Sequence, residues 1–500
     1  MTRNSQHGLG ASGGGKQTEG PSSQTLLSNT TYNALATIIT LLTTLVVSGY
    51  ASRKLGVDDF GRAQYLIWLV QTGGLIVGLG MPTTVSRFVA MYAARGDLSS
   101  AKSILTIAWL LCLVASTIGA AVIFMSVGGD IAPLAGLLLV LGTLQALQLA
   151  ACAGFGNYRS ILKAAAVGSL LSLATAIVCI DRFGIAGFLL VYAVAATTQV
   201  TVMLVTLRGQ ASGYSVSPIA ITRLKEIANF AAFTWLATIV SAFVWQRMEL
   251  YFIDRYLSST DVAYFSVAIT LGALISQPLS ILASALLPYF SAQLTFVDGM
   301  ERSVRIYVLL TKLFAWVSFF AAFVLAAHSG FLVTLVFGEA YIGAEQTVSF
   351  ILAGSAFGTV ASVGSALVYS AGRARFIFVS GVFGAVFTVL AGVTLVPSFG
   401  VMGAATFKIL IQLVMIAAGT VYIVQRLAFP FPIQSYCKSL ASAAIAAAVP
   451  GWVIGHSGVT SLILSLILSL LMYLALTRII GVFTPADVTA IKTALARIRR

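Results

Sequence analysis

Three charged side chains lie inside otherwise apolar stretches of this sequence: Arg247, Glu249 and Lys408. Because a charge in an apolar environment is unfavourable, each of them requires a partner or a function. The fork of an arginine can donate two parallel hydrogen bonds to a phosphate or carboxylate, and a lysine adds a point charge. These residues predict an anion-binding site, with Glu249 as the counter-ion of the two cations. The alternatives are a structural pair between Arg247 and Glu249, or an Arg247 side chain that extends to lipid headgroups.

Other residues are candidates for moving parts of the protein. Pro82 and Pro278 each remove a backbone hydrogen bond inside an apolar stretch, so they predict hinges or static kinks. A charged turn between two apolar stretches is expected to cap a helix start or to close a gate. The residues of this turn are Arg53, Lys54, Asp58 and Asp59.

Further polar side chains have mainly structural interpretations. Arg87 and Arg95 form a basic segment after the second apolar stretch, which indicates topology or a first contact with cytoplasmic lipid headgroups. Four cysteines without close pairs and three scattered histidines predict neither disulfides nor a metal site. Glutamines inside apolar stretches are expected to form hydrogen bonds between helices, with ligand contact as the alternative. They are Gln71, Gln145, Gln148, Gln277 and Gln412.

The composition requires an apolar solvent around the protein. Of the 500 residues, 59% are hydrophobic and only 9% are charged, whereas soluble domains carry about 25% charged residues. The net charge of +14 comes from Lys and Arg scattered through short loops, which excludes the clustered basic face of a nucleic-acid-binding domain. We therefore predict an all-α polytopic membrane protein with about fourteen transmembrane helices.

Charged breaks between apolar stretches divide the chain into six regions. Two predicted spans matter below, namely residues 65–87 and 230–253. With the N-terminus in the cytoplasm, 22 of the 29 Lys and Arg residues fall on the cytoplasmic side and 5 outside, which also places the C-terminus in the cytoplasm. The predicted regions are a disordered cytoplasmic tail (1–28), an N-lobe of six helices (29–208), an amphipathic connector (209–228), a C-lobe of six helices (229–425), two extra helices (433–480) and a basic cytoplasmic tail (481–500), whose residues 485–500 can form an amphipathic helix.

A weak internal repeat supports the two lobes. A shift of 202 residues aligns Leu55 with Leu257 and Asp59 with Asp261. A shift of 216 residues aligns glycines instead, namely Gly156 with Gly372, Gly184 with Gly400, and Gly187 with Gly403. We expect two six-helix lobes in parallel pseudo-repeat, with a substrate path between them.

The chain resembles the polysaccharide and O-antigen flippases of the multidrug/oligosaccharidyl-lipid/polysaccharide exporter superfamily. The layout of about fourteen spans carries this resemblance over nearly the whole chain. The glycine-rich second span and two local motifs carry it over residues 29–105. The motifs are LGVDDFGRAQY at residues 55–65 and RFVAMYAARGD at residues 87–97.

The resemblance implies a transporter rather than an enzyme, without catalytic residues, metal or cofactor. The cargo would be an undecaprenyl-pyrophosphate-linked oligosaccharide, moved from the inner to the outer leaflet of the bacterial plasma membrane for exopolysaccharide, capsule or O-antigen synthesis. Two lobes would give alternating access, and Arg247 and Lys408 would hold the pyrophosphate. Sugar contact by the glutamines is the alternative to their expected hydrogen bonds between helices. A monomer is implied, working with a polysaccharide polymerase and glycosyltransferases. Coupling to protons, sodium ions or membrane potential stays open.

Two other function classes remain. A cation-coupled multidrug antiporter of the same superfamily needs buried carboxylates, and Glu249 is the one acid clearly inside a predicted span. A membrane glycosyltransferase or polymerase needs clustered catalytic acids or histidines in a sizeable extramembrane domain, and the loops are too short to hold one.

Overall fold

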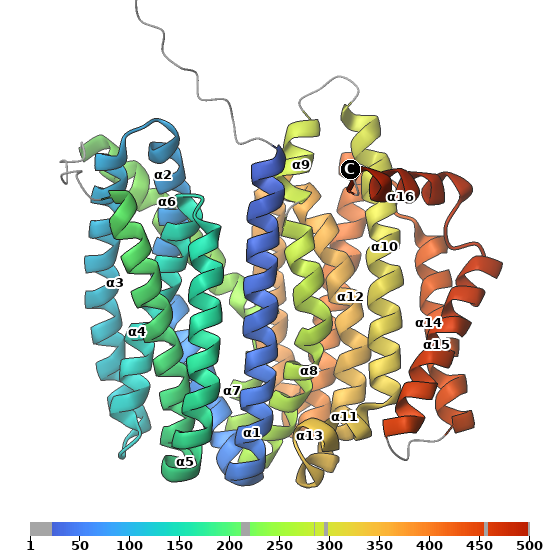
Figure 1. The fold of residues 1–500 in the computed structure, drawn as a ribbon, viewed down its shortest axis with the longest axis horizontal. Helices are drawn as coiled ribbons and strands as arrows, with labels where there is room; N and C mark the ends of the chain where they lie inside the picture. The colour runs from blue at the N-terminus through green and yellow to red at the C-terminus, as the bar shows by residue number, and fades with distance from the viewer. Residues whose placement is uncertain (1–22, 212–220, 285, 295–298, 455–458, 499–500) are drawn as a thin grey trace, which may run out of the picture.

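The computed structural model describes residues 23–211, 221–284, 286–294, 299–454 and 459–498. The predicted tail at 1–28 lies outside them except for residues 23–28, as does the central part of the predicted connector. The described chain is helical throughout, without strands (Figure 1). Its helices are α1 (Ser23–Val77), α2 (Met81–Ala94), α3 (Leu98–Val127), α4 (Ala132–Gly154), α5 (Tyr158–Ala211), α6 (Ile221–Trp245), α7 (Glu249–Tyr256), α8 (Ser259–Ser284), α9 (Leu286–Gln293), α10 (Gly299–Ala327), α11 (Ser329–Val336), the 3₁₀ helix η1 (Glu339–Ala344), α12 (Glu345–Ser370), α13 (Ala374–Leu427), α14 (Ile433–Ile454), α15 (Val459–Ile479) and α16 (Pro485–Ile498).

Three helices are too long to cross a membrane once. The helices α1, α5 and α13 have 55, 54 and 54 residues, which is about 80 Å at 1.5 Å per residue, against roughly 30 Å of hydrocarbon. Each contains one glycine with non-helical backbone angles: Gly56, Gly184 and Gly400, with φ of 77°, 55° and 61°. Glycine adopts positive φ readily, so each long helix is a pair of helices joined at that glycine.

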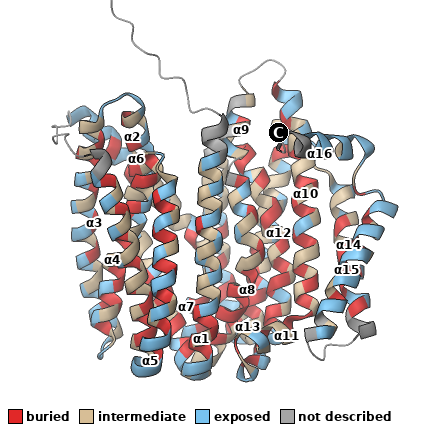
Figure 2. Ribbon diagram, viewed as in Figure 1, coloured by how far each residue is buried: buried red, intermediate tan, exposed pale blue. Residues whose placement is uncertain are grey.

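The predicted fold class is confirmed in the described residues. Nine of their helices are long and apolar enough to cross a membrane, including the three with a glycine break, and a shorter apolar helix covers Ile463–Ile479. Helix α3 presents large apolar side chains outward at every fourth position, at Leu110, Val114, Ile118 and Val122. Figure 2 shows the same contrast between buried inner and exposed outer faces elsewhere in the bundle. The count of fourteen crossings and the region boundaries stay predictions.

The backbone supports the predicted repeat of two lobes. Gly156 and Gly372, aligned by the 216-residue shift, have φ of 69° and 71°. Gly184 and Gly400 are aligned by the same shift and both break a long helix. One apolar core lies within the first lobe, another within the second, and a third joins both. Helices α14 and α15 lie beside α10 at one edge of the bundle (Figure 1).

Two predicted continuous spans are interrupted, and this corrects the sequence prediction. The span at 65–87 ends at Val77 and restarts at Met81, because Leu79 and Gly80 both have positive φ. Pro82 therefore lies in the first turn of a new helix, where its missing N–H is harmless. Pro278 lies inside the helical α8, as predicted. The hinge roles of both prolines stay predictions.

Candidate functional site

The second interruption places Arg247 where the interlobe and C-lobe cavities described below meet. The predicted span at 230–253 is divided into α6 and α7, and residues 246–248 between them are not helical. Backbone that is not helical at membrane depth is tolerated where it is buried in protein or lines a cavity. The break frees the carbonyl of Gln246, which accepts a hydrogen bond of 3.4 Å from Lys408 Nζ.

Lys408 and Glu249 form a buried ion pair. The distance from Lys408 Nζ to Glu249 Oε1 is 3.0 Å, and the two side chains are 10% and 1% exposed. Glu249 begins α7, so its carboxylate also lies at the positive end of that helix. The described residues give Arg247 no ion pair within 4 Å. Glu249 thus forms its direct ion pair with Lys408 rather than with Arg247, and Arg247 is a cation without a direct ionic partner among the described residues.

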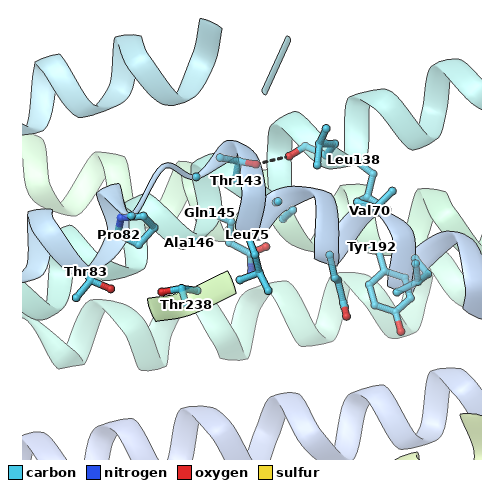
Figure 3. A pocket seen from close by; sticks show the side chains of 18 residues that line it. Val70, Leu75, Pro82, Thr83, Leu138, Thr143, Gln145, Ala146, Tyr192 and Thr238 are labelled. Atoms are coloured by element: carbon cyan, nitrogen blue, oxygen red, sulfur yellow. Dashed lines mark hydrogen bonds between the residues drawn. The ribbon is translucent and has the colours of Figure 1, made fainter. Parts of the chain in front are cut away.

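Three adjoining cavities connect the two lobes through this site. We call them the N-lobe cavity (about 400 Å³), the interlobe cavity (about 410 Å³) and the C-lobe cavity (about 340 Å³). The interlobe cavity shares lining residues with each of the other two. Gln71, Gln145 and Tyr192 line both the N-lobe and interlobe cavities. Arg247 lines both the interlobe and C-lobe cavities, and Lys408 lines the latter. Figure 3 shows the N-lobe cavity beside the start of α2 at Pro82.

Amide and hydroxyl side chains dominate the polar lining of the interlobe cavity. Threonines and serines come from α1, α5 and α8, and Gln145 Nε2 donates to Gln199 Oε1 at 2.8 Å. Among the described residues that line the three cavities there is no Asp or Glu. The glutamines of the interlobe cavity are Gln64, Gln71, Gln145, Gln199, Gln246 and Gln277.

The sequence predicted part of this lining. Gln71, Gln145 and Gln277 were candidates, and Gln412 lines the C-lobe cavity. Gln148 instead accepts a hydrogen bond from Trp109 Nε1 at 3.1 Å and is fully buried, which is the expected structural role. Sequence reasoning missed three glutamines, although they carry the same signal of an amide within or beside an apolar stretch. These are Gln64, Gln199 and Gln246.

In the charged turn, two residues contact the C-lobe. Arg53 donates hydrogen bonds to the carbonyls of Thr334, Leu335 and Val336, the last residues of α11. The Asp58 carboxylate accepts from the hydroxyls of Ser259 (3.1 Å) and Thr260 (2.6 Å) at the start of α8. A cation thus meets the negative end of one helix and an anion meets the positive end of another. We name these contacts the Arg53–Asp58 latch.

The other two residues of the turn stay within the N-lobe. Lys54 Nζ lies 3.2 Å from Asp181 Oδ2. The Asp59 carboxylate lies 3.7 Å from Arg62 Nη1, one turn further along the same helix. The four gate candidates therefore divide into two that join the lobes and two that do not, a distinction that the sequence did not make.

The basic segment has one contact across the lobes. The Arg87 guanidinium lies 4.3 Å from the ring centre of Phe230, so α2 and α6 meet through a cation–π contact. Arg95 is exposed at the end of α2. Contact of either residue with lipid headgroups stays a prediction.

A buried ion pair at α16 was missed. Lys312 Nζ lies 2.7 Å from Asp487 Oδ2, with side chains only 9% and 14% exposed. Burial by itself would raise the pKa of Asp487, but hydrogen bonds from Lys312 and Thr484 lower it below its usual value of 3.8. Residues 485–498 form a helix, as predicted, and it lies across the direction of the bundle (Figure 1).

Comparisons with known proteins identify the family and the fold. A family model described as polysaccharide biosynthesis protein matches residues 26–293. No curated protein matches the sequence. The fold is similar to that of lipid II flippase MurJ in an inward closed conformation, with a TM-score of 0.71 and 11% identity over 89% of this chain and 97% of that one.

Transporters of the MATE family have a similar fold. An inward-facing multidrug resistance MATE family transporter of the MOP superfamily gives a TM-score of 0.64 and 17% identity over 78% of this chain and 94% of the other. The Vibrio cholerae MATE transporter VcmN in its bent form gives 0.55 and 14% identity over 84% and 98%. Identities this low show the fold alone.

Proposed function

Because the chain belongs to the polysaccharide biosynthesis protein family and has the fold of MurJ and the MATE transporters, we propose that it is a flippase for a lipid-linked oligosaccharide. The cargo is an undecaprenyl-pyrophosphate-linked oligosaccharide, carried from the inner to the outer leaflet of a bacterial plasma membrane. The product serves synthesis of an exopolysaccharide, capsule or O-antigen. Both termini face the cytoplasm, and the monomer works beside glycosyltransferases and a polymerase.

One observation carries this proposal: the interlobe cavity has a lining rich in amides and hydroxyls, and it contains Arg247, a cation without a direct ionic partner in the described part of the chain. Sugar hydroxyls donate and accept hydrogen bonds, and so do amide and hydroxyl side chains. Arg247 supplies the fork that suits a phosphate group. The undecaprenyl chain stays in the bilayer against outward apolar faces such as that of α3.

The helix breaks and the latch suit alternating access between the lobes. The breaks at 78–80 and at 246–248 adjoin the cavities, so rotation there changes the cavity walls. The Arg53–Asp58 latch holds the lobes together at the charged turn, which is the outer side in the proposed orientation. The pyrophosphate head therefore enters from the cytoplasmic side in this conformation and leaves after the latch opens.

Cation-coupled multidrug export is the second candidate, favoured by the similarity to MATE transporters. A cationic drug is attracted most strongly by an anionic site, and the described cavity lining carries no acid, although Tyr192 and Trp245 contribute aromatic rings. Glu249 is paired with Lys408, which reduces its capacity to attract a second cation. The chemistry of the cavities therefore supports the flippase over the antiporter.

Reconstitution in vesicles tests the proposal. Purified protein should accelerate transfer of a fluorescent undecaprenyl-pyrophosphate oligosaccharide to the far leaflet, measured by reagent quenching, relative to protein-free vesicles. A cationic dye loaded into the same vesicles tests the alternative function, the antiporter. Equal lipid transfer with and without protein would exclude the flippase, and ion-dependent dye movement would support the antiporter.

A further inference from the structure

Charge is distributed unevenly along the three adjoining cavities. Arg247 and the Lys408–Glu249 pair lie at the junction of the interlobe and C-lobe cavities. The described residues that line the N-lobe cavity include no charged side chain. If the proposed function holds, the pyrophosphate at Arg247 fixes one end of the cargo, and the neighbouring cavities receive the glycan.

The N-lobe cavity is mainly apolar with a few polar groups. Gln71 makes no hydrogen bond within the described residues, and Gln145 donates to Gln199 but keeps its own carbonyl oxygen free. The hydroxyls of Thr83 and Thr238 also line the cavity (Figure 3). Gly74 and Gly142 line it without side chains that would fill it.

This lining matches a sugar ring, which has apolar C–H faces and a polar edge. The N-lobe cavity has a volume of about 400 Å³, which is within the usual range of 300–1,000 Å³ for small-molecule sites. An amide such as Gln71 can donate to and accept from the same hydroxyl-bearing edge. A carboxylate in the same position would meet no cation among the described lining residues and would lose its water, which is unfavourable.

We propose that the N-lobe cavity is a glycan subsite beside the interlobe cavity and that it selects uncharged sugars over acidic ones. Gln71 and Gln145, at its junction with the interlobe cavity, are the residues that determine this specificity. The proposal rests on the flippase function, but it concerns a different part of the cargo from the pyrophosphate.

Two fluorescent probes that share the undecaprenyl pyrophosphate test the specificity in reconstituted vesicles. One carries a neutral trisaccharide, and the other carries the same trisaccharide with a terminal uronic acid. The wild-type protein should transfer the neutral probe about tenfold faster than the acidic one, because the acidic sugar loses hydration without gaining a cation. Gln71→Lys should reduce this ratio several-fold by adding a cation to the cavity.

A matched variant and a stability measurement complete the design. Gln434→Lys makes the same change at an exposed position of α14 and should leave the ratio unchanged. Gln145→Lys provides a second cavity variant in case Gln71→Lys does not fold, as judged by thermal unfolding in detergent.

Equal wild-type rates for both probes, or a wild-type ratio in both folded cavity variants, would overturn the glycan subsite but leave the flippase intact. Absence of protein-dependent transfer for either probe would instead reject the flippase and the subsite together.

Discussion

At the scale of single residues, Arg247 and Lys408 have different surroundings despite their equal charge. Lys408 is held by Glu249 at 3.0 Å and by the Gln246 carbonyl. Arg247 lines two cavities and has no ion pair within the described residues. We therefore assign the proposed anion-binding role first to Arg247, whereas Lys408 also contacts the break between α6 and α7.

Substitution of Arg247 should impair transport rather than folding. Hydrogen bonds to charged groups contribute about 1.5–3 kcal/mol, so Arg247→Ala should slow lipid transfer by roughly 10- to 100-fold. Transfer in vesicles and export of surface polysaccharide at matched expression measure the effect. Arg255→Ala, at an exposed position near the end of α7, is the control. Wild-type transfer by Arg247→Ala would reject its role.

Substitution of Lys408 should impair stability first. Lys408→Met leaves the Glu249 carboxylate buried without a partner, which typically destabilises a protein by about 3–5 kcal/mol. The double variant Lys408→Met/Glu249→Leu removes both charges and should recover most of the lost stability, measured by thermal unfolding in detergent. Transfer by the stable double variant then shows whether Lys408 contacts the cargo. A Lys408→Met protein as stable as wild type would contradict the ion pair.

At the scale of elements, helix ends determine how the lobes meet. The latch pairs Arg53 with the end of α11 and Asp58 with the start of α8. Beside it, a Cβ on Gly61 would lie within 1.9 Å of the Ser259 carbonyl oxygen, so glycine permits this close approach. The charged turn therefore packs closely against the start of α8 in this arrangement of the lobes.

Breaking the latch should shift the protein away from this closed state. Arg53→Ala and Asp58→Ala should increase the distance between spin labels at Arg182 and Ile342, measured by electron paramagnetic resonance in a cysteine-free background. Lys54→Ala and Asp59→Ala change the same charges in the same turn but do not remove contacts between lobes. If all four variants gave the same distance distribution, the latch would have no role in closure.

The docking of α16 should depend on Asp487 and on acid. The pKa of Asp487 is lowered when it is docked, so docking is fully stabilised above its usual value of 3.8 and is lost as pH falls through the lower, docked value. Asp487→Asn should release α16 at neutral pH, detected as faster proteolysis after residue 484. Asp130→Asn, at an exposed loop position, is the control. Equal proteolysis of both variants would contradict this anchor.

At the scale of the whole molecule, the predicted orientation rests on the charge distribution and on an even number of crossings. The basic loops predict cytoplasmic termini. Alkaline phosphatase fused after Arg500 should therefore be inactive, and a fluorescent protein fused there should be bright. Fusions at the loop after Val127 should show the opposite result. An active phosphatase at Arg500 would imply an odd number of crossings and invert the later loops.

The sequence by itself determined the fold class, because the apolar surface of this chain excludes an aqueous environment. It also indicated the repeat, because one shift of 216 residues aligns Gly184 with Gly400, the two glycines that break long helices. It identified Arg247, Glu249 and Lys408 as a group, because charges inside apolar stretches are rare.

Only the tertiary structure decided how these residues pair. Arg247 and Lys408 lie 161 positions apart in the sequence, and spacing along separate helices does not specify which cation reaches Glu249. The break between α6 and α7 contains no proline, so the local sequence did not predict that the helix would be interrupted there. The cavities, the latch and the Lys312–Asp487 pair likewise depend on how distant helices pack, because each combines residues from elements that do not adjoin in the chain.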